Sequence, residues 1–182
     1  MTMNDGTVTF RQYVRPHEIS SALRGTVVDC WIEVSDAGGA AGFPFPPVDR
    51  GEVTAAADRI IEGLSPERSR LLVARGDGEL VGWLNVRRDP HALVSHWGSL
   101  HHVQTRTSLR GRGIGAALMR QVRAIARDEM GLEQLHLAAR GGVGLEDFYG
   151  RLGWKEIGRW PGALRLAPGD DRDEILMHLA PL

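Results

Sequence analysis

The spacing of apolar residues in the first third of the chain changes from strand-like to helical, and it predicts a strand followed by two helices. Residues 7–14 alternate between apolar and polar as a strand does, and Pro16 begins a helix that runs to about Ser35. Residues 36–47 are rich in glycine and proline and are expected to form a loop. A second helix follows, and the apolar residues on its buried face are Val53, Ala57, Ile60, Ile61 and Leu64.

In the middle of the chain, apolar and polar residues alternate with period two, and the apolar residues then return to helical spacing. The alternation predicts strands near residues 70–75, 79–88 and 95–105, and Gly76-Asp77-Gly78 joins the first two as a hairpin turn. A long amphipathic helix comes next and ends at Gly131. Its apolar stripe consists of Ile114, Leu118, Val122, Ile125, Ala126 and Met130.

The last third contains shorter elements. The pattern predicts a strand at 134–138, a helix at 145–152, and strands at 154–160 and 174–179. The resulting order is βααβββαβαββ, and residues 97–138 form a right-handed parallel β-α-β unit within it. We therefore expect a flexible N-terminus at residues 1–6 and one α/β domain, of the α+β type, over residues 7–182.

The junction between the third of the middle strands and the long helix has the composition of an anion-binding loop. It consists of Arg110-Gly111-Arg112-Gly113-Ile114-Gly115-Ala116. Glycine lets the backbone adopt positive φ and approach a ligand closely, and the free N–H groups in the first turn of a helix favour an anion. Arg106, Arg110 and Arg112 are also placed to meet phosphate groups.

Two familiar phosphate motifs do not fit this loop. A P-loop requires Lys and then Ser or Thr after its last glycine, but Ala116 and Ala117 stand there. A dinucleotide-binding fold requires G-x-G-x-x-G and an acidic residue at the end of the next strand, whereas here the spacing is G-x-G-x-G and Glu133 precedes that strand. What remains is R-x-x-G-x-G, or an ordinary glycine-containing turn between a strand and a helix.

R-x-x-G-x-G, from Arg110 to Gly115, resembles the pyrophosphate-binding motif of the GCN5-related N-acetyltransferases, the GNAT family. Downstream, Phe148-Tyr149-Gly150-Arg151-Leu152-Gly153-Trp154 resembles the F-Y-x-x-x-G-[FW] segment of that family. The two motifs occur in the order and spacing of the family, and the resemblance covers essentially the whole chain. It implies a twisted, mostly antiparallel sheet with a central parallel β-α-β unit for acetyl-CoA and helices on both faces.

The resemblance also implies where acetyl-CoA binds. In the family the two parallel strands splay apart, and the pantetheine arm lies in the gap like an extra strand. On this sequence the backbone of Val103 and Thr105 would bind the arm, and the Val103 N–H would polarise the acetyl carbonyl. The expected cofactor-binding residues are Val103, Gln104, Thr105, Arg110, Gly111, Arg112, Gly113, Ile114, Gly115 and Ala116. No metal is expected.

Transfer of the acetyl group to an amine requires an acid for the departing thiolate. Tyr149 matches the tyrosine that many members of the family use, and a phenol with a pKa of about 10 can protonate a thiolate. The alternative is a tyrosine that only packs against its own helix.

Transfer also requires a base for the ammonium group. Because neighbouring side chains on a strand face opposite sides, one histidine of the pair His101 and His102 is expected to face the cleft. We choose His101, which shares a side with Ser99 and Val103 and holds the position of a cleft-facing histidine in serotonin-acetylating relatives. A pKa of about 6.5 suits this role. The alternative is a histidine that is solvated or that forms its hydrogen bonds with a neighbouring strand.

A narrower resemblance concerns the acceptor. Residues 34–43 and Trp160-Pro161-Gly162 resemble the tabtoxin-resistance type of acetyltransferase, which acylates a small toxin derived from an amino acid. Ser99 and Ala138 stand where those enzymes place acidic residues, and Gly142 replaces the Asn that usually precedes the F-Y pair. The residues expected to bind a partly apolar or anionic amine are Trp31, Phe43, Ser99 and Arg140, together with Phe45.

Composition excludes several other classes of protein. The net charge of -1 gives no general case for nucleic acid, no apolar run approaches the ~20 residues of a membrane span, and the first residues lack the features of a signal peptide. We therefore expect a cytoplasmic protein with neither nucleic acid nor a membrane as its partner. The single cysteine, Cys30, has helical spacing from Leu23, Val27 and Val34 and is expected to be a core thiol.

The leading hypothesis is an acetyl-CoA-dependent N-acetyltransferase that acts by direct transfer on a small molecule, such as an antibiotic, a toxin or an amino-acid derivative. The missing acidic residues leave open a second hypothesis, a CoA-binding sensor or structural protein without turnover. A third hypothesis, acetylation of a protein or peptide, requires a wide groove and depends on how the loop at residues 37–49 lies. The sequence also leaves a homodimer open.

Overall fold

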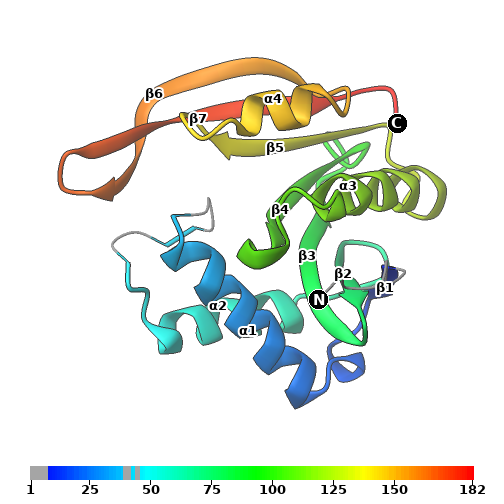
Figure 1. Cartoon of the computed structure of the whole chain (residues 1–182). Helices are drawn as coiled ribbons and strands as arrows, with labels where there is room; N and C mark the ends of the chain where they lie inside the picture. Colours follow the sequence, from blue (N-terminus) through cyan, green and yellow to red (C-terminus); the bar gives the residue numbers. More distant parts are fainter. Residues whose placement is uncertain (1–7, 39–41, 44–45) are drawn as a thin grey trace.

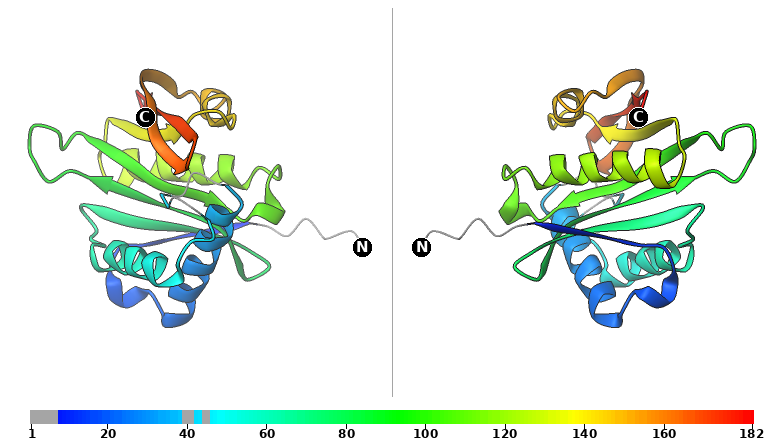
Figure 2. Two further views of the ribbon diagram at one scale, coloured as in Figure 1. Left: turned by 90° about the vertical axis from the view of Figure 1, so that its left-hand side faces the viewer. Right: turned by 90° about the vertical axis from the view of Figure 1, so that its right-hand side faces the viewer.

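The strands form one twisted sheet that helices cover on both faces (Figure 1; Figure 2). The computed structural model describes residues 8–38, 42–43 and 46–182, so the predicted N-terminus at residues 1–6 and Phe45 lie outside the described residues. The elements are β1 (Thr9–Tyr13), α1 (Ser21–Asp36), α2 (Arg50–Glu62), β2 (Ser69–Gly76), β3 (Glu79–Arg88), β4 (Trp97–Thr105), α3 (Ile114–Ala124), β5 (Gln134–Arg140), α4 (Leu145–Gly150), β6 (Lys155–Ala167) and β7 (Asp170–Leu179).

The sheet of the described residues has the strand order β1-β2-β3-β4-β5-β7-β6. All neighbouring strands are antiparallel except β4 and β5, which run parallel and are joined by α3, as predicted. These two strands pair only from Trp97 to Ser99 of β4, and beyond that point they diverge (Figure 1). The divergence leaves the later backbone of both strands without a partner from the other.

Two hydrophobic cores pack against opposite faces of the sheet. On one face α1 and α2 cover β2 and β3, with Trp31 and Trp83 both buried. On the other face α3 and α4 cover the strands, with Leu118 of α3 fully buried. Cys30 is 0% exposed in the first core, which confirms that it is a core thiol. The predicted element order and the mixed α/β fold class are confirmed.

The first helix begins later than predicted. Pro16–Glu18 form a separate 3-10 turn, and Ile19 is extended. The helix then starts at Ser21, because the side chain of Ser20 accepts a hydrogen bond from the Leu23 N–H and caps the new helix.

The hairpin of β6 and β7 is longer than predicted. Pro161 and Gly162 indicate an end at Trp160, yet β6 continues to Ala167. Because β6 is an edge strand, its outer N–H groups need no partner, and a proline there removes no ladder bond. The register between β6 and β7 shifts between Trp160 and Leu164, where the two residues lie.

Candidate active site

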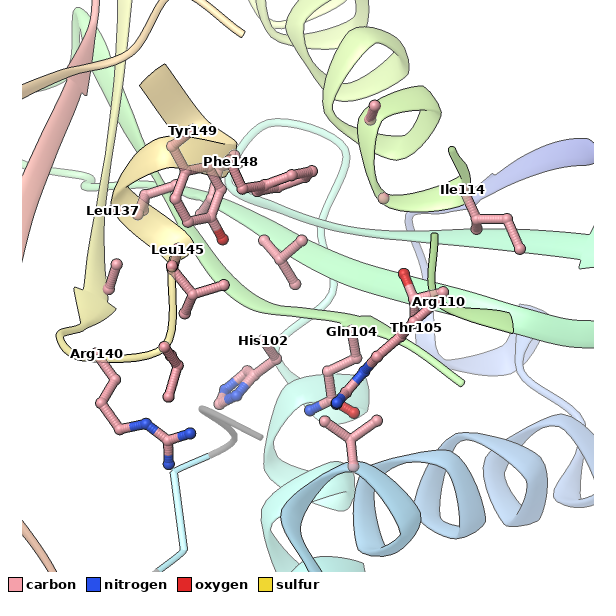
Figure 3. Close-up of a pocket in the computed structure, with 18 of the residues that line it drawn as sticks. His102, Gln104, Thr105, Arg110, Ile114, Leu137, Arg140, Leu145, Phe148 and Tyr149 are labelled. Carbon is pink, nitrogen blue, oxygen red and sulfur yellow. The ribbon is translucent and has the colours of Figure 1, made fainter. Parts of the chain in front are cut away.

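A cavity of about 780 Å³ opens where β4 and β5 part (Figure 3). Its walls come from the end of β4, the loop that precedes α3, the end of β5, and α4. Tyr149 from α4 and Arg140 from the end of β5 reach it from one side, and Arg110 and Gln104 reach it from the other. Every residue of the predicted cofactor set lines this cavity except Arg112, which is exposed.

The glycine loop leaves its backbone open to a ligand. Gly111 and Gly113 have φ angles of 78° and 79°, in the left-handed region that glycine tolerates best. A Cβ at either position would meet no atom within 4 Å, so the backbone conformation and not crowding requires glycine. Gly113 precedes α3, and no side chain in the described part of the chain caps the first turn of that helix. The first amide groups of α3 are therefore available to an anion.

A carboxylate from α1 fixes the start of this loop. Glu33 accepts hydrogen bonds from the Thr107 N–H at 2.7 Å, from the Thr107 hydroxyl at 2.6 Å and from the Arg106 guanidinium at 2.6 Å. Burial opposes ionisation of Glu33, but these hydrogen bonds outweigh it and lower its pKa below the ordinary value. Arg106 is thus occupied by Glu33 rather than directed at a phosphate. Sequence reasoning did not identify Glu33, because nothing in α1 marks its partner 73 residues away.

Strand β4 contains a bulge beside the cavity. Asn85 of β3 lies opposite His101, but Trp83 lies opposite Gln104, so that β4 has one more residue than β3 between these two pairs. His102 has a φ angle of 56°, which lies in the left-handed region. The bulge interrupts the alternation of side chains, and the cavity is lined by His102 and not by His101. The expectation that alternation turns His101 and not His102 to the cleft is therefore wrong.

The environment of the two histidines also differs from the expectation. The ring of His102 lies 4.4 Å from the ring of Trp31 and 5.8 Å from that of Trp83. Burial, together with the charges of Arg87 and a neighbouring histidine, lowers the pKa of both His101 and His102 to about 4, not the value near 6.5 that was expected. Both rings are therefore neutral at pH 7 and can accept a proton.

Tyr149 is 6% exposed, and its hydroxyl oxygen points into the cavity (Figure 3). Its ring lies 5.0 Å from that of Phe148 and 5.9 Å from that of Trp154, so packing fixes its orientation. Burial raises the pKa of the hydroxyl, which consequently keeps its proton.

Comparison with models of protein families shows to which family the chain belongs. The model of the acetyltransferase (GNAT) family matches residues 38–154, which is more than half of the chain and includes both motifs. The chain belongs to the GNAT acetyltransferase family. A search of curated proteins gives no match.

Solved GNAT structures share this fold along their length. A candidate phosphinothricin N-acetyltransferase is 17% identical, with a TM-score of 0.76, and the match covers 96% of this chain and 98% of that one. A ribosomal-protein-alanine N-acetyltransferase from Brucella melitensis is 19% identical, with a TM-score of 0.71 and coverage of 94% and 99%. An aminoglycoside 6'-N-acetyltransferase complexed with coenzyme A is 15% identical, with a TM-score of 0.69 and coverage of 94% and 96%. These identities establish the fold and leave the acceptor open.

Gln104 and Arg140 are two of the polar side chains on the first cavity's wall in this GNAT protein. Gln104 is 2% exposed, and neither its amide nitrogen nor its amide oxygen has a hydrogen-bond partner among the described residues. Arg140 is 6% exposed and donates a hydrogen bond to the carbonyl oxygen of Gly38, two residues after α1. Within the described ranges, no group of His, Cys, Asp and Glu is arranged to hold a metal ion, and no helix is long and apolar enough to cross a membrane.

Not all predicted acceptor residues of this GNAT domain meet at one place. A second cavity of about 380 Å³ lies between α1, α2 and β3, and Trp31 and Phe43 form part of its wall. Their rings are 5.2 Å apart. Arg140 lines the first cavity instead, and Ser99 lines neither, because its hydroxyl lies 3.2 Å from His136 of β5. Among the described residues, His102 alone lines both cavities.

Proposed function

We propose that the protein is an acetyl-CoA-dependent N-acetyltransferase that transfers the acetyl group directly to the amine of a small molecule. The observation that carries this proposal is one cavity with uncapped helix amides at one end and the Tyr149 hydroxyl in its wall. A phosphate-bearing thioester needs both, because its diphosphate requires anion-binding amides and its thiolate requires a proton.

The residues present fit acetyl-CoA. The amides from Gly111 to Ala116 would hold the diphosphate, and the open space above Gly111 and Gly113 leaves room for it. The backbone of Val103 and Thr105 lies where β4 has lost its pairing with β5, so its polar groups are available to the pantetheine amides. Acetyl-CoA would supply the activated acetyl group.

Two side chains are proposed for proton transfer. The amine nitrogen forms a bond to the acetyl carbonyl carbon, the carbon–sulfur bond breaks, and the sulfur takes a proton from the Tyr149 hydroxyl. The proton that leaves the amine passes to a histidine of the pair His101 and His102. We assign this step to His102, because it lines the cavity and is neutral at pH 7, with His101 behind it at a ring separation of 6.0 Å.

We also propose an acceptor of the kind modified by the tabtoxin-resistance type, a small amine derived from an amino acid. A second cavity of only about 380 Å³ supports a small acceptor over a protein or peptide, because it lies near the lower limit of ligand pockets. A role in resistance to a toxin or antibiotic and a cytoplasmic location follow from this proposal.

The test is direct. Calorimetry should detect binding of acetyl-CoA, and thiol release should follow when the protein is incubated with acetyl-CoA and a panel of primary amines. Binding without thiol release from any amine would favour a CoA-binding protein without turnover. The absence of acetyl-CoA binding would overturn the proposed function as a whole.

A further inference from the structure

The second cavity has an uneven distribution of charge. Two arginines lie at its wall, Arg59 from α2 and Arg87 from β3, and no Asp or Glu lines it among the described residues. Both arginines are exposed, and neither makes an ion pair within the described part of the chain. Elsewhere the arginines that do pair have carboxylates within 4 Å, as Arg24 does with Asp58. The cavity therefore presents uncompensated positive charge.

Asn85 adds a hydrogen-bond acceptor to the same wall. It is 1% exposed, and its amide nitrogen donates to the Ser69 hydroxyl at 3.1 Å and to the Arg70 carbonyl oxygen at 3.0 Å. Because a carbonyl oxygen can only accept, this contact fixes which end of the amide is the nitrogen. No described residue donates to the amide oxygen of Asn85. That oxygen can accept a hydrogen bond from an amine, which the positive guanidinium groups cannot do.

Most of the remaining wall is apolar. Trp31, Phe43, Ala56 and Ile60 line the cavity from α1, α2 and the segment between them. His102 separates this cavity from the first one and lines both. An acceptor bound here can thus bring its amine to His102, the residue that both cavities share, with an apolar body against the two aromatic rings.

We propose that this second cavity is the acceptor subsite and that it selects a small amine that also carries an anionic group, such as a carboxylate, bound by Arg87. This inference rests on the proposed function, because it names the substrate class of that reaction. The charge of the wall disfavours polyamines and aminoglycosides, since a second ammonium group would face arginine without a carboxylate to meet it.

Matched pairs of amines test the inference. The protein saturated with acetyl-CoA is assayed by thiol release with L-phenylalanine against 2-phenylethylamine, and with L-methionine against 3-(methylthio)propylamine, because the members of each pair differ only in the carboxylate. Spermidine serves as the polycation. We expect kcat/KM to favour the carboxylate-bearing member at least about tenfold, which is the effect of one hydrogen-bonded charge.

The variants Arg87→Gln and Arg87→Lys separate charge from bulk. Arg87→Gln should remove most of this preference, mainly through KM, and Arg87→Lys should keep part of it. Arg120→Gln, an exposed arginine on α3 that lines neither cavity, should change nothing. A preference for the amines without a carboxylate or for spermidine, or a preference that survives in Arg87→Gln, would overturn the inference and leave the acetyltransferase function intact.

A binding measurement keeps the inference testable if no amine is acetylated. Trp31 lines the cavity, so the tryptophan fluorescence of the protein should change saturably with L-phenylalanine in the presence of CoA, and the apparent Kd should rise about tenfold in Arg87→Gln. Equal Kd values for L-phenylalanine and 2-phenylethylamine in the wild-type protein would reject the subsite independently of turnover.

Discussion

The two cavities that meet at His102 differ in what forms them. The first is built around consecutive backbone groups, from Gly111 to Ala116, and its conformation depends on two glycines with positive φ. The second is built from side chains of α1, α2 and β3 that lie far apart in the sequence, such as Trp31 and Arg87. A binding site made of backbone groups depends on a short contiguous motif. A binding site made of side chains depends only on which residues the fold brings together from separate segments. The first cavity therefore contains a motif of the family, and the residues of the second can differ among its members.

The largest effect is expected at the proposed acid. Tyr149→Phe keeps the buried ring and removes only the hydroxyl, so the protein should fold and bind acetyl-CoA almost as before. Because the thiolate would leave without a proton donor, kcat with an identified amine should fall by about 10²–10⁴. Steady-state kinetics and calorimetry on the same preparation measure both quantities. A loss of CoA affinity with unchanged kcat would make the hydroxyl a binding group.

The next effect tests the glycine loop. Gly113→Glu places a negative charge beside the proposed diphosphate site, and like charges at such a distance cost several kcal/mol, so acetyl-CoA affinity should fall by at least about 10². Gly131→Glu is the matched control, because Gly131 also has positive φ with open space around it but lies outside the cavity. Calorimetry should show weak binding in the first variant and normal binding in the second. Equal affinities would reject the phosphate site.

A smaller effect should distinguish the two histidines. His102→Gln should lower kcat by about 10-fold to 10²-fold, less than a typical base, because a histidine with a depressed pKa is a weak base. His101→Gln should have a lesser effect, since its ring does not line the cavity. The reverse order would return the role to His101.

Stability as a function of pH gives a second measurement on the same pair. Both rings have a pKa of about 4 in the folded protein, against about 6.5 in the unfolded chain, so the unfolded chain binds more protons between these values. The free energy of unfolding should therefore decrease as the pH falls from about 6.5 to 4, by no more than about 3 kcal/mol for each histidine. Denaturant titrations of the double Gln variant should show a flatter profile. An unchanged profile would contradict the burial of the two rings.

The smallest effect is expected at Glu33, which joins α1 to the start of the glycine loop. Glu33→Gln weakens three hydrogen bonds to Arg106 and Thr107, so the protein should lose about 1–2 kcal/mol of stability and bind acetyl-CoA a few-fold more weakly. Asp58→Asn weakens another arginine–carboxylate pair on the helical layer, that of Arg24, and should leave acetyl-CoA affinity unchanged. If both variants bind equally well, Glu33 stabilises α1 without positioning the loop.

The sequence by itself determined the order of the elements, the parallel β-α-β unit and the position of the glycine loop. Each of these depends on local signals: apolar spacing, capping residues and glycines at fixed intervals. Tyr149 was also singled out in this way, because it belongs to a contiguous motif, and it lies in the wall of the first cavity; its role as an acid stays a prediction. The local signals were weaker at boundaries, as the cap at Ser20 and the proline inside the edge strand β6 show.

Only the tertiary structure decided which side chains meet. The bulge at His102 comes from the register between β3 and β4, which no alternation rule within β4 contains, and it places His102 instead of His101 in the wall of the first cavity. Glu33 reaches Thr107, and Arg87 shares a cavity with Trp31, because separate elements pack against one sheet. The physical reason is that local signals fix the conformation of the backbone over a few residues, whereas register, packing and burial are set by contacts between distant segments.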